Sequence, residues 1–327
     1  MMRDILDQPA SLSGVIEHQY GAGRRALEEA AAALRGASRV VVTGMGASLY
    51  SAIPLAYRLR ERGVACVTAE AAELLHYTPE MARGAVVVLV SRSGETVEAV
   101  KLLPMLRERG ALVIGVTNEG GTTLDREAHI PLHVGSGKDE MVAVQSYTGS
   151  AMALALLAAE TFQEDRREEA ERAVIDVEAA LAACREEPWQ PLLDGANVIY
   201  VLGRGPSTGS ALEGALLFHE TAKLPAVAMP CGGFRHGPVE VADCQFRAVV
   251  FASQARTREL DRSLAEHLTR LGARVRVVAG PGDWFLPVTE IIPLQFAAYR
   301  AAELRGIVPG RFRNTGQVTR SESDFPP

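Results

Sequence analysis

Short apolar runs alternate with segments of helical length along the first half of the chain. Five of these runs are rich in Val, Ile and Leu, as buried parallel strands are, and cover residues 39–43, 64–69, 85–90, 112–116 and 130–134. An alternation of strands and helices predicts a parallel sheet with helices on both faces. We therefore expect one complete doubly wound α/β domain of about five strands in this half of the chain.

Helical patterns flank the predicted domain on both sides. Residues 14–36 carry apolar positions at helical spacing and end at Gly36, a residue type that commonly follows a helix. We expect this stretch to form a helical arm. Residues 149–185 are rich in Ala, Leu, Glu and Arg and contain no proline, which predicts two long helices leading out of the domain.

The second half of the chain repeats the first. The matching stretches are 42–48 with 201–207, 86–91 with 249–253 after a small gap, and 110–116 with 272–278. A repeat on this scale predicts two tandem parallel-sheet domains of one doubly wound, flavodoxin-like fold. Pro188 and Pro191 mark the boundary between them. The expected division is a helical arm over 1–36, a first domain over 37–160, a helical linker over 161–192, and a second domain with the C-terminal tail over 193–327.

The composition is that of a soluble globular protein. Hydrophobic residues make up 47% of the chain and charged residues 23%, and the net charge is −6. This balance excludes the basic excess typical of nucleic-acid binding. No apolar run reaches the roughly 18 residues of a membrane span, and the first residues lack a basic segment followed by an apolar core. We therefore expect no signal peptide and no membrane anchor, and a cytoplasmic protein.

Cysteine and lysine are both scarce. The cysteines are Cys66, Cys184, Cys231 and Cys244, and they show no spacing typical of metal ligands. We expect no metal site. Only Cys231 lies near the suspected active site, and a lone cysteine is most often inert. The lysines are Lys101, Lys138 and Lys223.

Two glycine-rich loops resemble part of a dinucleotide-binding motif. Residues 44–46 and 203–205 both read Gly-x-Gly, but neither loop has the third glycine that packs helix and strand around a pyrophosphate. The Gly-Lys-Ser/Thr sequence of a P-loop is also absent. We therefore expect no nucleotide cofactor.

A hydroxyl-rich loop in the first half predicts a phosphate site. Residues 91–96, Ser-Arg-Ser-Gly-Glu-Thr, follow a predicted strand and precede a helix that begins near Val97. Hydroxyls and backbone N–H groups at a helix N-terminus bind phosphate with help from the helix dipole. Alternatively, Ser93 and Thr96 only cap the helix. Ligands of such sheets bind beyond the carboxyl ends of the strands, so Ser48, Ser91 and the loop at Ser207 are expected on ligand-facing edges.

The second half contains a candidate acid and base. Glu213 and Glu220 lie seven positions apart, on one face of a predicted helix that Pro225 ends. Residues 230–238 are rich in turn formers and can bring His236 back toward Glu220. A carboxylate facing an imidazole is a proton-transfer arrangement. Alternatively, Glu213 and Glu220 lie on a solvated helix edge and His236 is an ordinary loop histidine.

These motifs together resemble the sugar isomerase (SIS) family. They comprise residues 46–48, 91–96, 117–118, 202–205, 211–215 with Glu220, and 236–238. The similarity is greatest to the isomerase half of glucosamine-6-phosphate synthase and its stand-alone two-domain relatives, and it spans residues 37–327. The resemblance implies that Ser48, Ser91, Arg92, Ser93 and Thr96 hold a sugar phosphate. It also implies that Glu220 moves a proton between C1 and C2, and that His236 assists ring opening from the neighbouring subunit of a homodimer.

Three departures from that pattern bear on the reaction. The sequence shows no glutaminase domain and no N-terminal cysteine nucleophile, so synthase activity is not expected. Gln317 stands where the synthase carries an imine-forming lysine, and an amide cannot form a Schiff base. We expect Gln317 to bind substrate instead. Leu217 stands where a second lysine is usual one turn before Glu220.

The remaining pattern is similar to relatives whose substrates already carry nitrogen. These are isomerising amino-sugar-phosphate deaminases and fructosamine-6-phosphate deglycases, which need proton transfer and no imine of their own. The apolar neighbours Leu216, Leu217 and Phe218 are expected to raise the pKa of Glu220 toward neutrality. A plain aldose–ketose phosphosugar isomerase, a non-catalytic sugar-phosphate sensor and, more distantly, a nicotinamide dehydrogenase remain alternatives.

Overall fold

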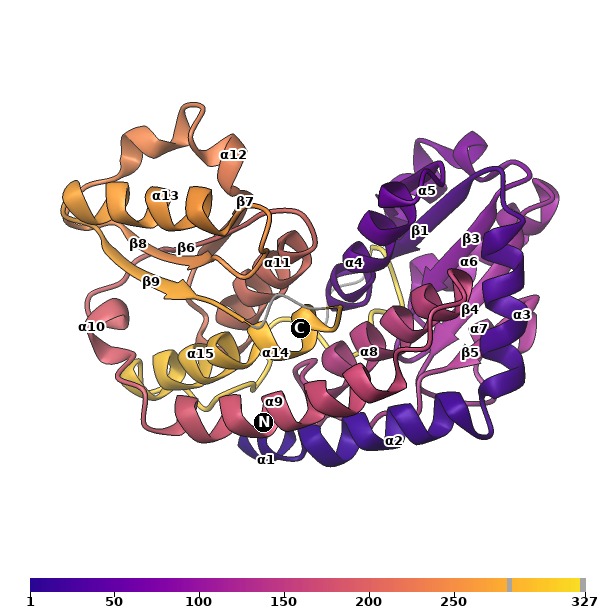
Figure 1. The fold of residues 1–327 in the computed structure, drawn as a ribbon, viewed down its shortest axis with the longest axis horizontal. Helices are drawn as coiled ribbons and strands as arrows, with labels where there is room; N and C mark the ends of the chain where they lie inside the picture. Colours follow the sequence, from indigo (N-terminus) through magenta and orange to yellow (C-terminus); the bar gives the residue numbers. More distant parts are fainter. Residues whose placement is uncertain (281–283, 324–327) are drawn as a thin grey trace. The chain divides into compact units, whose positions relative to one another are not determined.

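Two parallel sheets organise the chain, one in each of two compact units (Figure 1). The structure is a computed structural model that describes residues 1–280 and 284–323. One sheet has five strands in the order β2-β1-β3-β4-β5, and the other has four in the order β7-β6-β8-β9. We refer to the two parts as the five-stranded unit and the four-stranded unit. The first order is that of flavodoxin-like folds, and the second keeps the same order without the last strand. The predicted fold class is confirmed.

All five strands predicted in the first half are present, with ends shifted by one or two residues. They are β1 (Val40–Gly44), β2 (Cys66–Glu70), β3 (Val86–Val90), β4 (Leu112–Thr117) and β5 (Ile130–His133). Every residue of β1 and β3 is buried, because helices cover both faces of the sheet. The central strands run in register from Val40 opposite Val86 to Gly44 opposite Val90, so their carboxyl ends lie at the same edge.

Helices on both faces complete the five-stranded unit. They are α4 (Ala47–Glu61), α5 (Ala71–His76), the 3-10 turn η1 (Pro79–Ala82), α6 (Val97–Glu108), α7 (Thr123–Glu127) and α8 (Gln145–Thr161). On one face, Leu74 of α5 and Leu102 and Leu106 of α6 pack on the strands in a fully buried cluster. On the other face α4 packs against α8, which also contacts the arm helix α3.

The N-terminal arm is not one continuous helix. It comprises α1 (Met2–Leu6), α2 (Gln8–Tyr20) and α3 (Arg24–Arg35), and α3 ends at Gly36 as predicted. The break falls at residues 21–23, where the N–H groups of Gly21 and Gly23 both donate to the carbonyl of His18. A β-carbon at residue 21 would lie 2.8 Å from the backbone carbonyl oxygen of Glu17, so the turn favours glycine there.

The four-stranded unit repeats the strand–helix alternation. Its strands are β6 (Ile199–Gly203), β7 (Ala226–Pro230), β8 (Arg247–Phe251) and β9 (Arg274–Val278). Its helices are α11 (Ser207–Leu217), the π-helix η2 (Phe218–Ala222), α12 (Cys231–Phe234), the 3-10 turn η3 (Pro238–Val241), α13 (Arg258–Arg270), α14 (Leu286–Glu290) and α15 (Ile292–Leu304). The sequence analysis missed β7, because a five-residue strand between Pro225 and Pro230 reads as part of a loop.

The compact units do not follow the linear boundaries expected from the sequence. The five-stranded unit contains Ala10–Lys138, Gln145–Glu171 and the chain from Arg313, whereas the four-stranded unit contains Met1–Pro9, Asp139–Val144 and Arg172–Phe312. The helices α8 and α9 (Arg167–Arg185) confirm the two predicted long helices, and α10 (Gln190–Leu193) follows them. The tail from Arg313 belongs to the five-stranded unit. Residues 324–327, the end of the expected second domain, lie outside the described residues.

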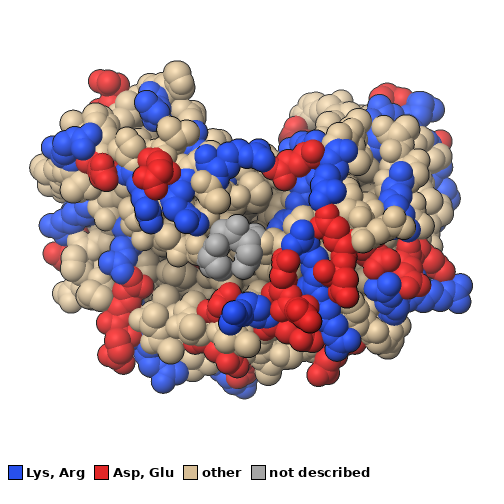
Figure 2. Space-filling view, in the orientation of Figure 1, with Lys and Arg blue, Asp and Glu red and all other residues tan. Residues whose placement is uncertain are grey.

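Surface charge is mixed on each unit. Figure 2 shows acidic and basic side chains interspersed over the visible surface of both. In the described ranges, no helix combines the length and the apolar composition that crossing a bilayer requires.

Candidate functional site

The predicted phosphate loop lies where the fold favours ligands. The loop follows β3, and residue Ser48 lies in the first turn of α4, directly after β1. These two strands are neighbours, and the chain order reverses between them in the sequence β2-β1-β3. Ligands of open parallel sheets bind at this switch point, outside the carboxyl ends of the strands. The structure therefore places Ser48 and the Ser91 loop at adjacent positions on the expected edge.

The hydroxyls of this loop do not serve simply as a helix cap. Ser91 and Ser93 are 3% and 7% exposed. Ser91 Oγ donates to Thr96 Oγ1 at 3.2 Å, and Ser93 Oγ accepts from the backbone N–H of Glu95 at 3.3 Å. Thr96 is the N-cap residue of α6, but its side chain makes no capping hydrogen bond. The alternative in which Thr96 only caps the helix is therefore wrong, and its hydroxyl faces that of Ser91.

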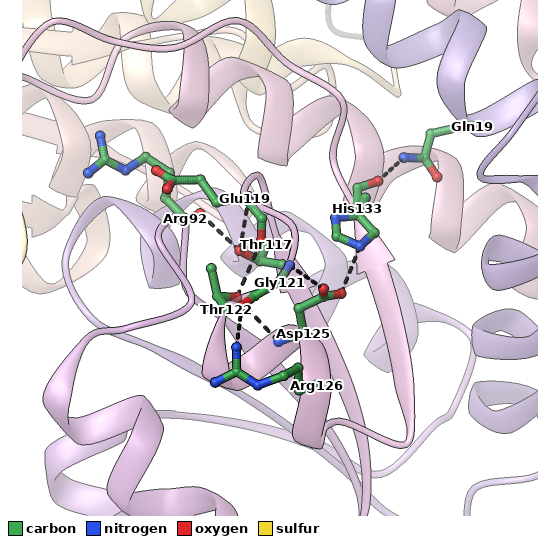
Figure 3. Close-up of polar contacts among 9 residues, drawn as sticks. All are labelled: Gln19, Arg92, Thr117, Glu119, Gly121, Thr122, Asp125, Arg126 and His133. Atoms are coloured by element: carbon green, nitrogen blue, oxygen red, sulfur yellow. Dashed lines mark hydrogen bonds and ion pairs between the residues drawn. The ribbon is translucent and has the colours of Figure 1, made fainter.

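The neighbouring loop after β4 holds the phosphate loop in shape (Figure 3). Thr117 Oγ1 and the N–H of Asn118 both donate to the carbonyl of Arg92, each at 3.0 Å. The Glu95 carboxylate accepts from the N–H and the hydroxyl of Thr123, at 2.6 and 3.0 Å. Glu95 is therefore a structural tie between two loops. The sequence offered no signal for this contact beyond the acid in the loop.

A glycine is required inside the phosphate loop. Gly94 has a φ of +64°, and a β-carbon built there would lie 2.1 Å from Thr122 Oγ1. Figure 3 shows Thr122 in the same network. The Thr122 hydroxyl accepts from the N–H of Asp125, and the Asp125 carboxylate contacts His133 Nε2 at 2.7 Å. Gln19 of α2 donates to the carbonyl of His133 at 2.6 Å. The loops around the proposed site are thus fixed to the end of β5 and to the arm.

The C-terminal tail reaches the same helix N-terminus. The backbone N–H of Val97, the first residue of α6, donates to the carbonyl of Thr319 at 3.0 Å. The Glu322 carboxylate contacts Lys101 Nζ and His76 Nε2, and these hydrogen bonds lower the pKa of Glu322. Gln317 is exposed and lies two residues before Thr319. The tail thus carries Gln317 on the unit that contains the phosphate loop.

The second candidate site lies in the four-stranded unit and contains an irregular helix. The expected regular helix through Glu220 is wrong, because α11 ends at Leu217 and Phe218–Ala222 continue as a π-helix. Such wider turns are frequent at functional sites. Glu213 is 1% exposed and its Oε2 has no hydrogen-bond partner, whereas Glu220 is only half-buried. Leu217 and Phe218 are buried as predicted.

The two carboxylates lie in different environments. Burial, together with the negative charges of Glu220 and Asp139, raises the pKa of Glu213 well above its usual range. Burial therefore favours the protonated form of Glu213. Glu220 is half-buried, and its role as the base stays a prediction.

Backbone contacts hold the π-helical segment in place. Arg305 Nε donates to the carbonyl of Ala222 at 3.1 Å, and the N–H of Ala226 donates to His219 Nε2 at 2.9 Å. Lys223 has a left-handed backbone, and its Nζ donates to the carbonyl of Glu220 itself. The sequence analysis gave Lys223 no place at the site. The fold instead holds its ammonium group at the backbone carbonyl of Glu220.

His236 does not meet Glu220 in the described part of the chain. It is exposed in the turn between α12 and η3, and no described hydrogen bond or ion pair joins it to Glu220. The sequence analysis expected the turn-rich segment to fold back, but residues 226–230 extend as β7 and carry the turn along the sheet. Its role at a neighbouring subunit stays a prediction.

Ser207 and Cys231 also lie in the four-stranded unit. The loop at Ser207 follows the carboxyl end of β6, as expected, but Ser207 itself is 1% exposed and its hydroxyl donates to Glu290 Oε2 at 3.0 Å. Cys231 fits the inert interpretation: burial, followed by the charge of Asp261, raises the pKa of its thiol to about 12. At that pKa almost no reactive thiolate is present near neutral pH.

The two sheets and their ligand-facing edges define a class of parallel α/β domains. Within that class, the model of the SIS domain family matches residues 33–160 and 192–284. These segments make up well over half of the chain, and the protein therefore belongs to the SIS domain family.

Curated relatives match almost the whole chain. The glutamine–fructose-6-phosphate aminotransferase [isomerizing] of Pyrobaculum aerophilum is 29% identical over 350 residues, and that of Aeropyrum pernix is 31% identical over 366 residues. Each match covers 98% of this chain but only 57% of the relative. The chain thus spans little more than half the length of these enzymes.

Solved structures share the fold along nearly the full length. The C-terminal domain of glucosamine-fructose-6-phosphate aminotransferase from Francisella tularensis superposes with a TM-score of 0.81 at 22% identity. Glucosamine-6-phosphate deaminase from Thermotoga maritima gives 0.79 at 22% identity. Both comparisons cover 94% of this chain and 96% of the other. At this level of identity they establish the fold alone.

Proposed function

We propose that this protein is an enzyme acting on an amino-sugar or ketosamine 6-phosphate, with the Glu220 carboxylate moving a proton between C1 and C2. On this proposal it is an isomerising deaminase or a deglycase. Family membership supports a phosphosugar substrate. The names of the relatives, an isomerising aminotransferase and an amino-sugar-phosphate deaminase, are consistent with a nitrogen-bearing one.

The phosphate loop is the observation that carries the proposal. Buried hydroxyls at the N-terminus of α6, at the switch point of a parallel sheet, are suited to a phosphate monoester. The residues proposed to hold the substrate are Ser48, Ser91, Arg92, Ser93 and Thr96 for the phosphate and Gln317 for a sugar hydroxyl. Glu220 and His236 are the proposed catalytic residues.

The lysines argue for nitrogen supplied by the substrate. Lys101 is paired with Glu322, and Lys223 is held at the carbonyl of Glu220. Lys138, the third, is exposed on another segment of the chain. An enzyme that forms no imine of its own needs only a carboxylate of suitable pKa to move the proton.

A turnover screen of the purified chain tests the proposal. Amino-sugar 6-phosphates and fructosamine 6-phosphates should be converted, and Glu220→Gln should lower kcat by about 10² to 10⁴. Glu186→Gln, a change at an exposed glutamate outside the site, is the matched control. Turnover only of sugar phosphates without nitrogen would favour a plain isomerase, and binding without turnover would favour a sensor. Either result contradicts the proposal.

Two further experiments test the mechanism and the assembly. Borohydride reduction during turnover should leave no sugar adduct on Lys223 or the other lysines. Mixing inactive Glu220→Gln with inactive His236→Ala protein should restore activity through hybrid dimers, if His236 serves a neighbouring subunit. A reduced lysine adduct, or no complementation despite proven subunit exchange, would count against the respective claim.

A further inference from the structure

A cavity of about 320 Å³ lies in the four-stranded unit, between α13 and the turn that follows α12. Its lining residues are Arg235, Val239, Ser263, Leu264, His267 and Arg270. Ser263, His267 and Arg270 follow helical spacing and lie on one face of α13. The cavity is thus built from two segments that converge on it.

The lining is strongly cationic. It contains two guanidinium groups and an imidazole, and no described lining residue is an aspartate or glutamate. Neither Arg235 nor Arg270 forms an ion pair among residues 1–280 and 284–323, whereas Arg262 on the same helix pairs with Glu259 at 3.3 Å. Unpaired cations converging on one cavity are unexpected in a chain with a net charge of −6.

The walls of the cavity are held by buried contacts. Asp261 of α13 is 1% exposed and accepts from Thr257 Oγ1 at 2.9 Å, and Cys231 and Phe234 of α12 lie in one buried cluster with Leu264 and Leu268 of α13. Phe234, at the end of α12, packs on Phe246 with ring centroids 5.6 Å apart. These contacts fix α12 to α13, so binding an anion would not have to draw the two segments together.

We propose that this cavity is a second anion site, separate from the loop at Ser91, that binds the phosphate group of a small phosphorylated metabolite. Guanidinium groups bind phosphate through paired charge-assisted hydrogen bonds. Buried Leu264 and half-buried Val239 offer apolar surface to the carbon part of the ligand. The volume suits a ligand of about hexose-phosphate size. Arg235 directly precedes His236, so an occupant holds the turn that carries the candidate catalytic histidine.

Calorimetry on the full chain tests this proposal, with inorganic phosphate and glucose 6-phosphate as probes. The measurements use a Ser91→Ala/Ser93→Ala background, which removes hydroxyls of the other phosphate site. Binding should persist in that background, and adding Arg235→Gln and Arg270→Gln should raise Kd about tenfold or more. Arg262→Gln is the matched control and should leave Kd unchanged.

The measured affinities support or overturn the second anion site as follows. No binding in the background protein, or binding unaffected by Arg235→Gln/Arg270→Gln, would overturn the proposal. Tighter binding of glucose 6-phosphate than of inorganic phosphate supports a metabolite, and equal affinity supports free phosphate as the ligand. Both arginines are exposed, so the variants should fold. Should the double variant fail to fold, Arg270→Lys keeps the charge but loses paired hydrogen bonding, and an unchanged Kd there would equally count against the site.

Discussion

The backbone N–H of Val97 donates a hydrogen bond to the carbonyl oxygen of Thr319, with 3.0 Å between nitrogen and oxygen. Val97 begins α6, so its N–H is one of the donors that a helix leaves without an internal partner. The C-terminal tail therefore occupies a donor next to the proposed phosphate loop. That contact links the C-terminal tail to the helix that begins directly after the proposed phosphate loop.

Neutralising Glu322 should release the tail from α6. The Glu322 carboxylate holds the tail through Lys101 and His76, which lower its pKa. In Glu322→Gln the amide of Val97 should exchange faster with solvent, as measured by hydrogen–deuterium exchange. In the wild type the same change should appear in acid, because a carboxylate with a lowered pKa stabilises its contacts above its ordinary pKa and loses them as pH falls through the lowered value. Glu73→Gln, at an exposed glutamate of α5, is the control, and equal exchange in both variants would contradict the prediction.

Gly94→Ala should destabilise the protein and weaken binding of a phosphorylated ligand. The left-handed backbone alone costs an alanine about 1–2 kcal/mol, and the new β-carbon would also collide with Thr122. Gly110→Ala is a matched control, since Gly110 has nearly the same φ but open space around it. Urea unfolding should show a loss beyond that of the control, and calorimetry a weaker affinity. Equal losses in the two variants would show that the loop tolerates the side chain.

Glu213→Gln should stabilise the protein increasingly as pH rises. The pKa of Glu213 is raised in the folded state, so its contribution to stability is fully present below the ordinary pKa of about 4.3 and is lost as pH rises toward the raised value. Glutamine keeps the shape without titrating. The difference in free energy of unfolding between variant and wild type should grow by up to about 1.4 kcal/mol per pH unit. Urea unfolding from pH 5 to 9 measures this slope, and a flat difference would mean that Glu213 is ionised in the fold.

Thiol labelling should distinguish the cysteines. Burial raises the pKa of Cys66 and Cys184 to about 11 and that of Cys231 to about 12, whereas Cys244 is exposed. Iodoacetamide at about pH 8 should therefore alkylate Cys244 first, with the other three reacting only after unfolding. Mass spectrometry of digests before and after denaturation reads this out. Rapid labelling of Cys231 in the folded protein would reopen a catalytic role for it.

Some features of this protein follow from local sequence. Residues 86–90, Val-Val-Val-Leu-Val, place apolar side chains on both faces of a strand. Both faces must then be buried, as in parallel sheets covered by helices, so such runs predict a doubly wound fold. The hydroxyl-rich stretch from Ser91 to Thr96 lies between such a strand and a helix, and its position at the sheet edge follows from that order. The strands and the phosphate loop were predicted for this reason.

Other features depended on contacts between segments distant in the sequence. No periodicity encodes the π-helical turn at Glu220 or the raised pKa of Glu213, which follows from burial and from the charges of Glu220 and Asp139. Glu290, distant in the sequence, accepts a hydrogen bond from the hydroxyl of Ser207. The tail binds α6 because the N–H of Val97 has no partner within the helix and because Glu322 neutralises the charge of Lys101. Local sequence determined the five strands of the first half and the long helices. Only the tertiary structure decided which side chains are buried or available for chemistry, because those properties are set by neighbours brought together in folding.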